Sequence, residues 1–152
     1  MVRAMSWRIH KQVASSWALI ACGLWLTALG LYFIFIRPAL LPEDLRFMNA
    51  SLAQARAGLP GLEGWLHKVF TVMGGFIAGT GVLTVFVAAT AMPSRLRGAS
   101  SALAVTGLLT VALMSATNFA LQSEYRWLLQ APAVVWLAGL LFHVARPSPH
   151  SG

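Results

Sequence analysis

Residues 69–92 read VFTVMGGFIAGTGVLTVFVAATAM and contain no Asp, Glu, Lys or Arg. A helix of this length, rising about 1.5 Å per residue, crosses the roughly 30 Å of hydrocarbon in a bilayer. Residues 13–36, 101–122 and 127–145 are equally free of charged side chains. The last segment contains Pro132, which a membrane helix tolerates near its end. The sequence therefore predicts an all-α, polytopic membrane protein in which four transmembrane helices form one bundle.

The composition of the whole chain supports a single membrane domain over residues 1–152. Hydrophobic residues make up 58% and charged residues 10%, whereas about a quarter of the residues in a soluble domain are charged. The net charge of +7 would suggest a nucleic-acid partner in a soluble protein. Here the basic residues lie between apolar segments, so membrane topology and lipid head groups explain them better. We expect membrane lipid, and no nucleic acid, as a partner.

The distribution of charge predicts the orientation. Six basic residues fall on the side of both termini (Arg3, Arg8, Lys11, Arg95, Arg97 and Arg146), and five fall on the other side (Arg37, Arg46, Arg56, Lys68 and Arg126). The first side consists almost entirely of short flanking segments, which the positive-inside rule weighs most. The first apolar segment exceeds the usual 7–15 residues of a signal peptide, so we expect it to be retained. The prediction is a bacterial inner-membrane protein with cytoplasmic N- and C-termini.

The long loop between the first two spans holds three of the four acidic residues of the chain, Glu43, Asp44 and Glu63. Leu45, Met48, Leu52, Ala55 and Leu59 follow Pro42 at three- and four-residue intervals. This spacing predicts an amphipathic helix over residues 42–57 that lies on the outer membrane surface or caps the bundle. A solvated helical linker is the alternative.

Small residues cluster in the second span, in GGFIAGTG. Gly75 and Gly79 form a GxxxG pair, with Gly74 and Gly81 beside them. Small residues let two helices approach closely within lipid. We expect these four glycines to pack inside the bundle; the alternative is the seam of a homodimer.

The third span carries the polar face of the membrane segments. Ser115, Asn118 and Gln122 are spaced so that they point the same way, and Gln130 lies near the start of the fourth span. Such side chains usually form hydrogen bonds between helices, which is the interpretation we favour for this face. The alternative is a ligand site.

The ligand hypothesis places a pocket at the outer end of the bundle. Its candidate residues are Ser115, Asn118, Gln122, Gln130, Glu43, Asp44, Arg46 and Arg126. The loop helix would form the roof and Asn118 the floor, and the pocket would suit an amphiphile with its head group at the amide and charged groups.

Residues for catalysis or cofactor binding are sparse. Cys22 is the single cysteine, so a cysteine pair cannot form. His67 and His143 lie at opposite ends of the bundle, which does not suit membrane haem. The spans hold no charged residue, which argues against ion-coupled transport. We expect no cofactor, no metal and no enzymatic activity.

The layout of four short spans, with GGFIAGTG in the second and a long loop after the first, resembles small bacterial DoxX-like membrane proteins. The resemblance implies the architecture and no site residue. Two functional hypotheses remain. The favoured one is an accessory or scaffold subunit that docks to a larger membrane complex, or to itself, through the glycine face and the loop helix. The alternative is binding, transport or modification of a lipid or hydrophobic small molecule at the polar pocket.

Overall fold

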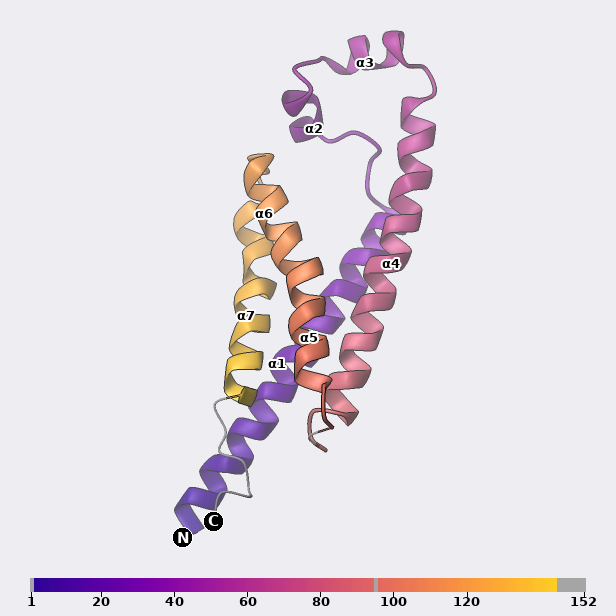
Figure 1. Ribbon diagram of the computed structural model, residues 1–152. Coiled ribbons are helices and arrows are strands. Elements are labelled where there is room, and N and C mark those ends of the chain that lie inside the picture. The colour runs from indigo at the N-terminus through magenta and orange to yellow at the C-terminus, as the bar shows by residue number, and fades with distance from the viewer. Residues whose placement is uncertain (1, 95, 145–152) are drawn as a thin grey trace.

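The computed structural model describes residues 2–94 and 96–144, and of residues 2–14 it describes the backbone alone. Within those ranges every regular element is helical (Figure 1): α1 (Val2–Phe35), α2 (Pro42–Phe47), α3 (Leu52–Gly58), α4 (Leu62–Thr90), α5 (Ala99–Gly107), the π-helical turn η1 (Leu108–Ala112), α6 (Leu113–Ala120) and α7 (Arg126–Val144). The side chains of Arg3, Arg8, Lys11, Arg95 and Arg146, which carry much of the predicted orientation, lie outside the described residues.

Among the described residues, four helical stretches are long and apolar enough to cross a membrane: Ser15–Phe35, Leu62–Thr90, Ala99–Ala120 and Arg126–Val144. The four predicted spans are therefore confirmed, and the chain fits a multi-pass membrane protein. The largest difference is at α4, which begins at Leu62 instead of residue 69. Its 29 residues extend about 44 Å at 1.5 Å per residue. That length exceeds the hydrocarbon thickness, so part of α4 extends beyond it.

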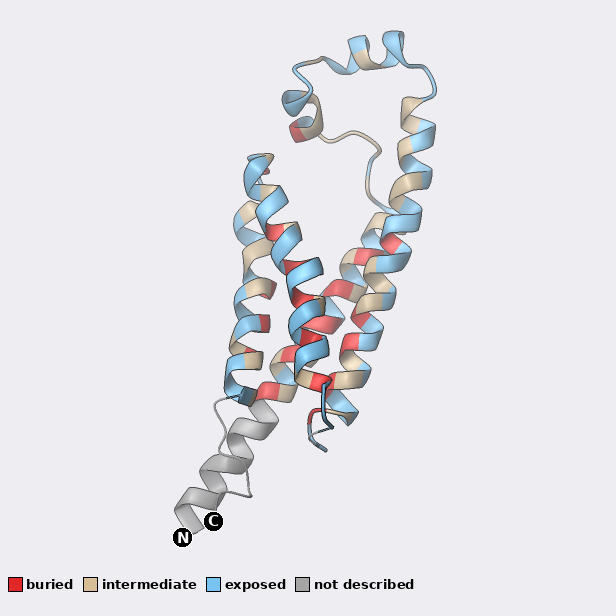
Figure 2. Cartoon of the chain, viewed as in Figure 1, coloured by how far each residue is buried: buried red, intermediate tan, exposed pale blue. Residues whose placement is uncertain are grey.

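Helix α1 is the central helix of the bundle. It packs along α4 on one side and against α7 on the other, while α5 and α6 pack on α7. Buried residues accordingly gather where α1 faces its neighbours (Figure 2). Toward the end that carries α2 and α3, the α6–α7 pair diverges from α4 (Figure 1). We call this end of the bundle the loop end.

Glycines set the close approach of α1 and α4. A Cβ atom added at Gly81 would lie 2.5 Å from the carbonyl oxygen of Gly23, and one added at Gly74 would lie 2.6 Å from that of Gly30. These distances leave no room for a side chain, so the two backbones meet directly. The pairs Gly23–Gly30 and Gly74–Gly81 have the same seven-residue spacing, which keeps both contacts on one seam of two antiparallel helices.

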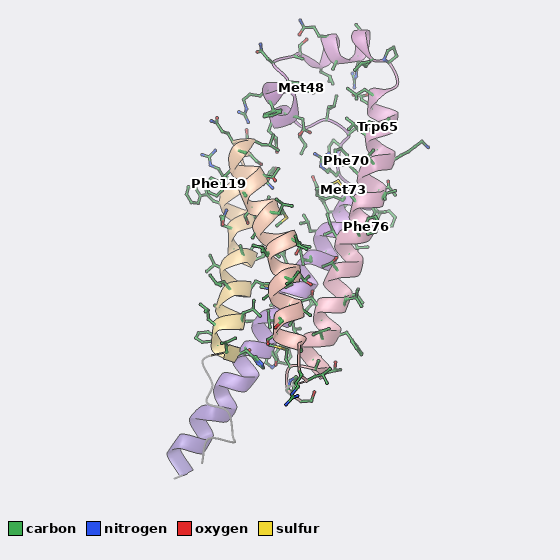
Figure 3. All side chains as sticks on the ribbon, viewed as in Figure 1. Met48, Trp65, Phe70, Met73, Phe76 and Phe119 are labelled. Atoms are coloured by element: carbon green, nitrogen blue, oxygen red, sulfur yellow. The ribbon has the colours of Figure 1, made fainter. Side chains whose placement is uncertain are left out.

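The other two glycines of the predicted packing face do not belong to this seam. A Cβ atom at Gly75 or Gly79 would meet nothing within 4 Å. The prediction that this GxxxG pair packs inside the bundle is therefore wrong for the described chain. The reason is helical geometry: Gly75 follows Gly74 by one residue, and a step of about 100° turns it away from α1. Phe76, which is 74% exposed, extends from the same helix (Figure 3).

Four hydrogen bonds from side chains to carbonyl oxygens link α7 to its neighbours. Ser15 Oγ donates to Gly139 O at 3.0 Å, joining α7 to α1. Trp136 Nε1 donates to Leu103 O at 3.1 Å, joining α7 to α5. That indole lies where a Cβ at Gly107 would clash with it. Because no water is present in hydrocarbon, such bonds satisfy groups that would otherwise remain unpaired.

The other two of these bonds lie at the turn around Pro132. Proline has no N–H to donate to Leu128 O, so the helix is weakened there. Ser115 Oγ donates to Leu129 O, beside that gap, at 3.1 Å, and Cys22 Sγ lies 3.4 Å from Pro132 O. Neighbouring helices thus supply donors at the weakened turn, which explains how α7 accommodates a proline in its interior.

The expectation of one amphipathic helix over residues 42–57 is not confirmed. The segment forms two short helices, α2 and α3, separated at Asn49, whose φ is +51°. The amides of Asn49 and Ala50 donate to Arg46 O and Leu45 O, the pattern of a Schellman C-cap. Ser51 then caps α3 by accepting from the amide of Gln54. These caps interrupt the helix that the apolar periodicity predicts. No residue of α3 is buried.

Candidate functional site

A cavity of about 330 Å³ lies at the loop end. We call it the loop-end cavity. Its lining comes from α1, α2, α6, α7 and the turns beside them: Trp25, Leu29, Tyr32, Phe33, Arg37, Leu41, Glu43, Asp44, Met114, Asn118, Leu121, Ser123, Tyr125, Leu128 and Leu129. The lining combines membrane-depth apolar side chains with a few charged and polar groups. That combination is typical of sites for small molecules.

The apolar wall belongs to the membrane-crossing helices. Trp25 and Leu29 lie on successive turns of α1, and Met114 and Leu128 face the cavity from α6 and α7. The wall lies toward the loop end, where the α6–α7 pair diverges from α4 (Figure 1). Side chains of this kind suit a hydrocarbon tail.

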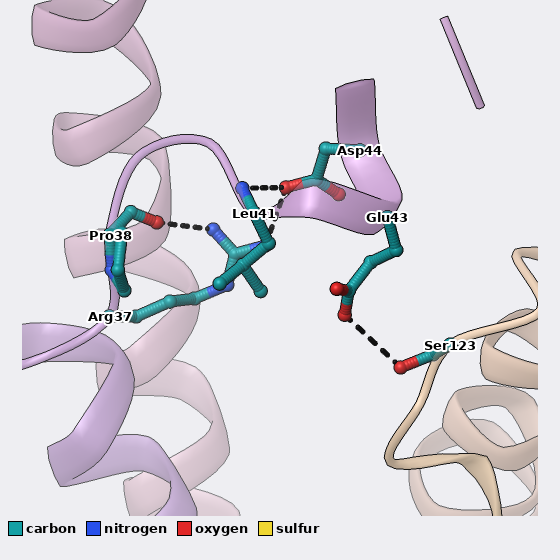
Figure 4. Close-up of polar contacts among 6 residues, drawn as sticks. All are labelled: Arg37, Pro38, Leu41, Glu43, Asp44 and Ser123. Carbon is teal, nitrogen blue, oxygen red and sulfur yellow. Dashed lines mark hydrogen bonds and ion pairs between the residues drawn. The ribbon is translucent and has the colours of Figure 1, made fainter. Parts of the chain in front are cut away.

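Arg37 fixes the position of the segment that follows α1. Its Nη2 atom pairs with Asp44 Oδ2 at 3.3 Å, and its Nη1 donates to Pro38 O at 2.9 Å (Figure 4). The guanidinium carbon lies 3.7 Å from the ring centroid of Phe70 on α4, a cation–π distance. Asp44 Oδ2 also accepts from the amide of Leu41 at the start of α2. Arg37 therefore ties α1, α2 and α4 together beside the cavity.

Glu43 joins α2 to the turn between α6 and α7. Its Oε1 atom accepts from Ser123 Oγ at 3.1 Å (Figure 4), although the two residues are 80 positions apart. Glu43 is 7% exposed and Ser123 is 1% exposed. This contact holds α2 over the cavity as a roof.

The α6–α7 turn owes its shape to Gln122, whose φ is +50°. The amide of Gln122 donates to Phe119 O and that of Ser123 to Asn118 O, which is again a Schellman C-cap. Glycine usually occupies the left-handed position of this motif. The sharp turn brings Ser123 under Glu43, so Gln122 shapes the site through the backbone.

Asn118 lies on the cavity wall formed by α6. Its Nδ2 atom donates to Met114 O, one turn earlier, at 2.9 Å. Its Oδ1 atom has no hydrogen-bond partner among the described residues. Asn118 therefore brings to the lining an amide oxygen that no described residue uses.

Of the eight predicted ligand residues, Glu43, Asp44 and Asn118 line the loop-end cavity, and the remaining five do not: Ser115, Gln122, Gln130, Arg46 and Arg126. Ser115 is buried and bonds α7, as the packing interpretation predicts. Arg46 and Gln122 are exposed, and Gln130 and Arg126 are half-buried outside the lining.

Sequence reasoning did not identify Ser123 or the aromatic residues Trp25, Phe33 and Tyr32 as part of the site. Ser123 follows a residue with positive φ, and a glutamine gives no warning of that conformation. The aromatic residues of the first span gave no signal beyond general hydrophobicity.

A second cavity of about 300 Å³ lies between α4 and the α5–η1 segment. Thr80, Thr84, Thr106 and Thr110 line it, together with Leu83, Val87, Ala102, Leu103 and Leu109. The Thr80, Thr84 and Thr110 hydroxyls donate to carbonyls of their own helices. No charged side chain belongs to the lining of this cavity, in contrast to the loop-end cavity.

Among the described residues no group of three or more His, Cys, Asp or Glu side chains is arranged to hold a metal ion. Comparison of the chain with protein-family models, curated proteins and solved structures finds no match in any of the three. The loop-end cavity is therefore the main basis for a functional proposal.

Proposed function

We propose that this protein binds a lipid or another amphiphile in the loop-end cavity. One observation carries the proposal: a single cavity joins an apolar wall on α1, α6 and α7 to the buried carboxylate of Glu43 and the open amide oxygen of Asn118. An apolar tail and a polar head group would satisfy these two regions at once. At about 330 Å³ the cavity would hold the head group and the first part of a chain, with the rest of the chain among the helices and lipid.

The proposed setting is the outer leaflet of a bacterial inner membrane, with both termini in the cytoplasm. The distribution of basic residues between short and long loops supports this orientation. The segment that carries α2 and α3 would then lie at the outer surface. Its exposed side chains Phe47, Met48 and Leu59 would rest against the head-group region. A relationship to DoxX-like proteins remains a proposal based on this architecture.

A second candidate function is docking as an accessory subunit, and one observation favours it. Gly75 and Gly79 leave open space on a face of α4 that no other part of the described chain covers. Small residues at this spacing let a partner helix approach closely in the membrane. The partner would be a larger membrane complex or a second copy of the chain. The two functions are compatible, since they use different faces.

Amphiphile binding can be tested with a substitution that fills the cavity. Leu29→Trp adds bulk to its apolar wall, whereas Leu24→Trp makes the same change on an exposed position of α1 outside the lining. Each protein is extracted in mild detergent and weighed intact. We expect the wild type and Leu24→Trp to retain an amphiphile, and Leu29→Trp to lose it.

Equal retention by both variants would contradict the proposal, and so would a wild type that never carries an amphiphile. Circular dichroism of both variants serves as the control for folding. If Leu29→Trp has the same helix content as the wild type, its loss of ligand reflects the filled cavity and not unfolding.

A further inference from the structure

Glu43 is a buried carboxylate without a cation. One of its oxygens accepts from Ser123 Oγ, and no other group of the described residues bonds or pairs with it. The residue is 7% exposed. A charge removed from water is costly unless it is paired, and one neutral hydroxyl offsets little of that cost. A cation in the cavity would stabilise this carboxylate.

Among the described residues, none supplies that cation. Arg37 lines the cavity, but its guanidinium is already paired with Asp44, bonded to Pro38 O and stacked on Phe70. Its side chain is 9% exposed. The lining contains one basic residue and two carboxylic acids, Glu43 and Asp44, so it carries one net negative charge when these groups are ionised.

The remaining polar groups also favour a ligand that donates hydrogen bonds. The open oxygen of Glu43 and the Oδ1 atom of Asn118 can only accept. A primary ammonium carries one positive charge and three N–H donors. A phosphoglycerol head group carries no cation to offset the charge of Glu43, and a quaternary ammonium has charge but no N–H.

We infer that the loop-end cavity selects amphiphiles whose head group carries a primary ammonium. This inference rests on the proposed function and specifies its ligand class. The ammonium binds Glu43 and the Asn118 amide oxygen, and the tail lies against Trp25 and Leu29.

The experiment uses three phospholipids with identical acyl chains: phosphatidylethanolamine, phosphatidylcholine and phosphatidylglycerol. They are added in equal amounts to the full-length protein in mild detergent, and the bound lipid is identified by intact mass. We expect about tenfold more phosphatidylethanolamine than either competitor, a difference of about 1.4 kcal/mol. An excess of free ethanolamine should not displace it, because it lacks the tail.

Glu43→Gln tests whether the negative charge of Glu43 causes the preference for a primary ammonium. Its amide oxygen can still accept from Ser123, so α2 should remain docked, but the negative charge is lost and the preference should disappear. Glu63→Gln is the matched control, because Glu63 pairs with Arg56 outside the cavity lining. It should keep the wild-type preference.

Two results would overturn the ligand class alone: equal binding of the three lipids by the wild type, or an ethanolamine preference that survives in Glu43→Gln. In either case loss of all three lipids from Leu29→Trp would still support the proposed function. Displacement by free ethanolamine would overturn the choice of a lipid ligand. Absence of any bound lipid in the wild type would overturn both proposals.

Discussion

At the scale of single residues, the polar side chains of the third span and its flanks divide into different roles. Ser115 bonds a carbonyl of α7, Asn118 faces the loop-end cavity and Gln122 shapes a turn through its positive φ. Their spacing predicted a common direction, but not which partner each would meet. The partner of Ser115 depends on α7, since the acceptor lies beside Pro132.

Ser115→Ala should lower stability because it removes the hydrogen bond from α6 to Leu129 O beside Pro132. Hydrogen bonds between membrane helices contribute about 0.6 kcal/mol on average and up to about 1.7, and the weakened turn puts this one toward the upper value. Thr117→Ala is the control, since that exposed hydroxyl bonds a carbonyl of its own helix. Thermal unfolding in detergent should show a lower midpoint for Ser115→Ala alone. Equal midpoints would refute the interhelical role.

Gln122→Gly should stabilise the protein. A left-handed backbone costs an L-residue about 1–2 kcal/mol, and glycine removes that cost while adding entropy to the unfolded chain. We expect a net gain of about 0.5–1 kcal/mol, observed as a higher unfolding midpoint. Asn49→Gly, at the other positive φ, should change less because asparagine tolerates this conformation. A lower midpoint for Gln122→Gly would show that its side chain matters more than its backbone.

At the scale of helices, the four spans could be predicted because each is a long run without charge, which depends on nothing beyond the run itself. The seam between α1 and α4 was only half predicted. Gly74 and Gly81 were recognised, but Gly23 and Gly30, seven residues apart in the first span, were not. The seven-residue spacing in each helix indicates a contact only when the two helices are compared with each other. The prediction of one helix over residues 42–57 failed for a different reason. The capping preferences at Asn49 and Ser51 end one helix and begin another, and they outweigh the apolar stripe.

Gly81→Ala should separate α1 from α4. The new Cβ would lie 2.5 Å from Gly23 O and 2.5 Å from the Thr27 amide, and neither backbone atom can move alone. Overpacking of this kind costs about 1–3 kcal/mol. Gly79→Ala, which opens onto empty space, should remain within about 0.5 kcal/mol of the wild type. The midpoints of thermal unfolding would show the difference, and similar losses in both variants would mean that the seam is misplaced.

At the scale of the molecule, the architecture joins a closely packed pair, α1 and α4, to a second pair, α6 and α7, that diverges from α4 toward the loop end (Figure 1). The cavity lies at this divergence, with α2 over it. The general location of the cavity could be predicted, since the sequence places acidic and amide residues at the same end of the predicted bundle. Its apolar wall could not, because Trp25 and Leu29 become special only through the divergence of the helices.

The proposed orientation predicts different access to two serines. Ser51 caps α3 at the loop end, and Ser94 lies in the turn after α4 at the opposite end, and both are exposed. Ser51→Cys should react with a membrane-impermeant maleimide on intact cells, whereas Ser94→Cys should react only after permeabilisation. Cys22 is 2% exposed and should give no background. The opposite labelling pattern would show that the orientation in the membrane is the reverse of the proposed one.

Photo-crosslinking tests the central claim, occupancy of the loop-end cavity by an amphiphile, most directly. A phospholipid with a diazirine near the start of its acyl chain is incorporated with the protein into a bilayer, irradiated, and mapped by peptide mass spectrometry. The account predicts adducts concentrated on the cavity-lining residues Trp25, Leu29 and Met114. Adducts confined to exposed faces outside both cavities, such as those of Val134 and Leu141, would show only surrounding lipid and would contradict it.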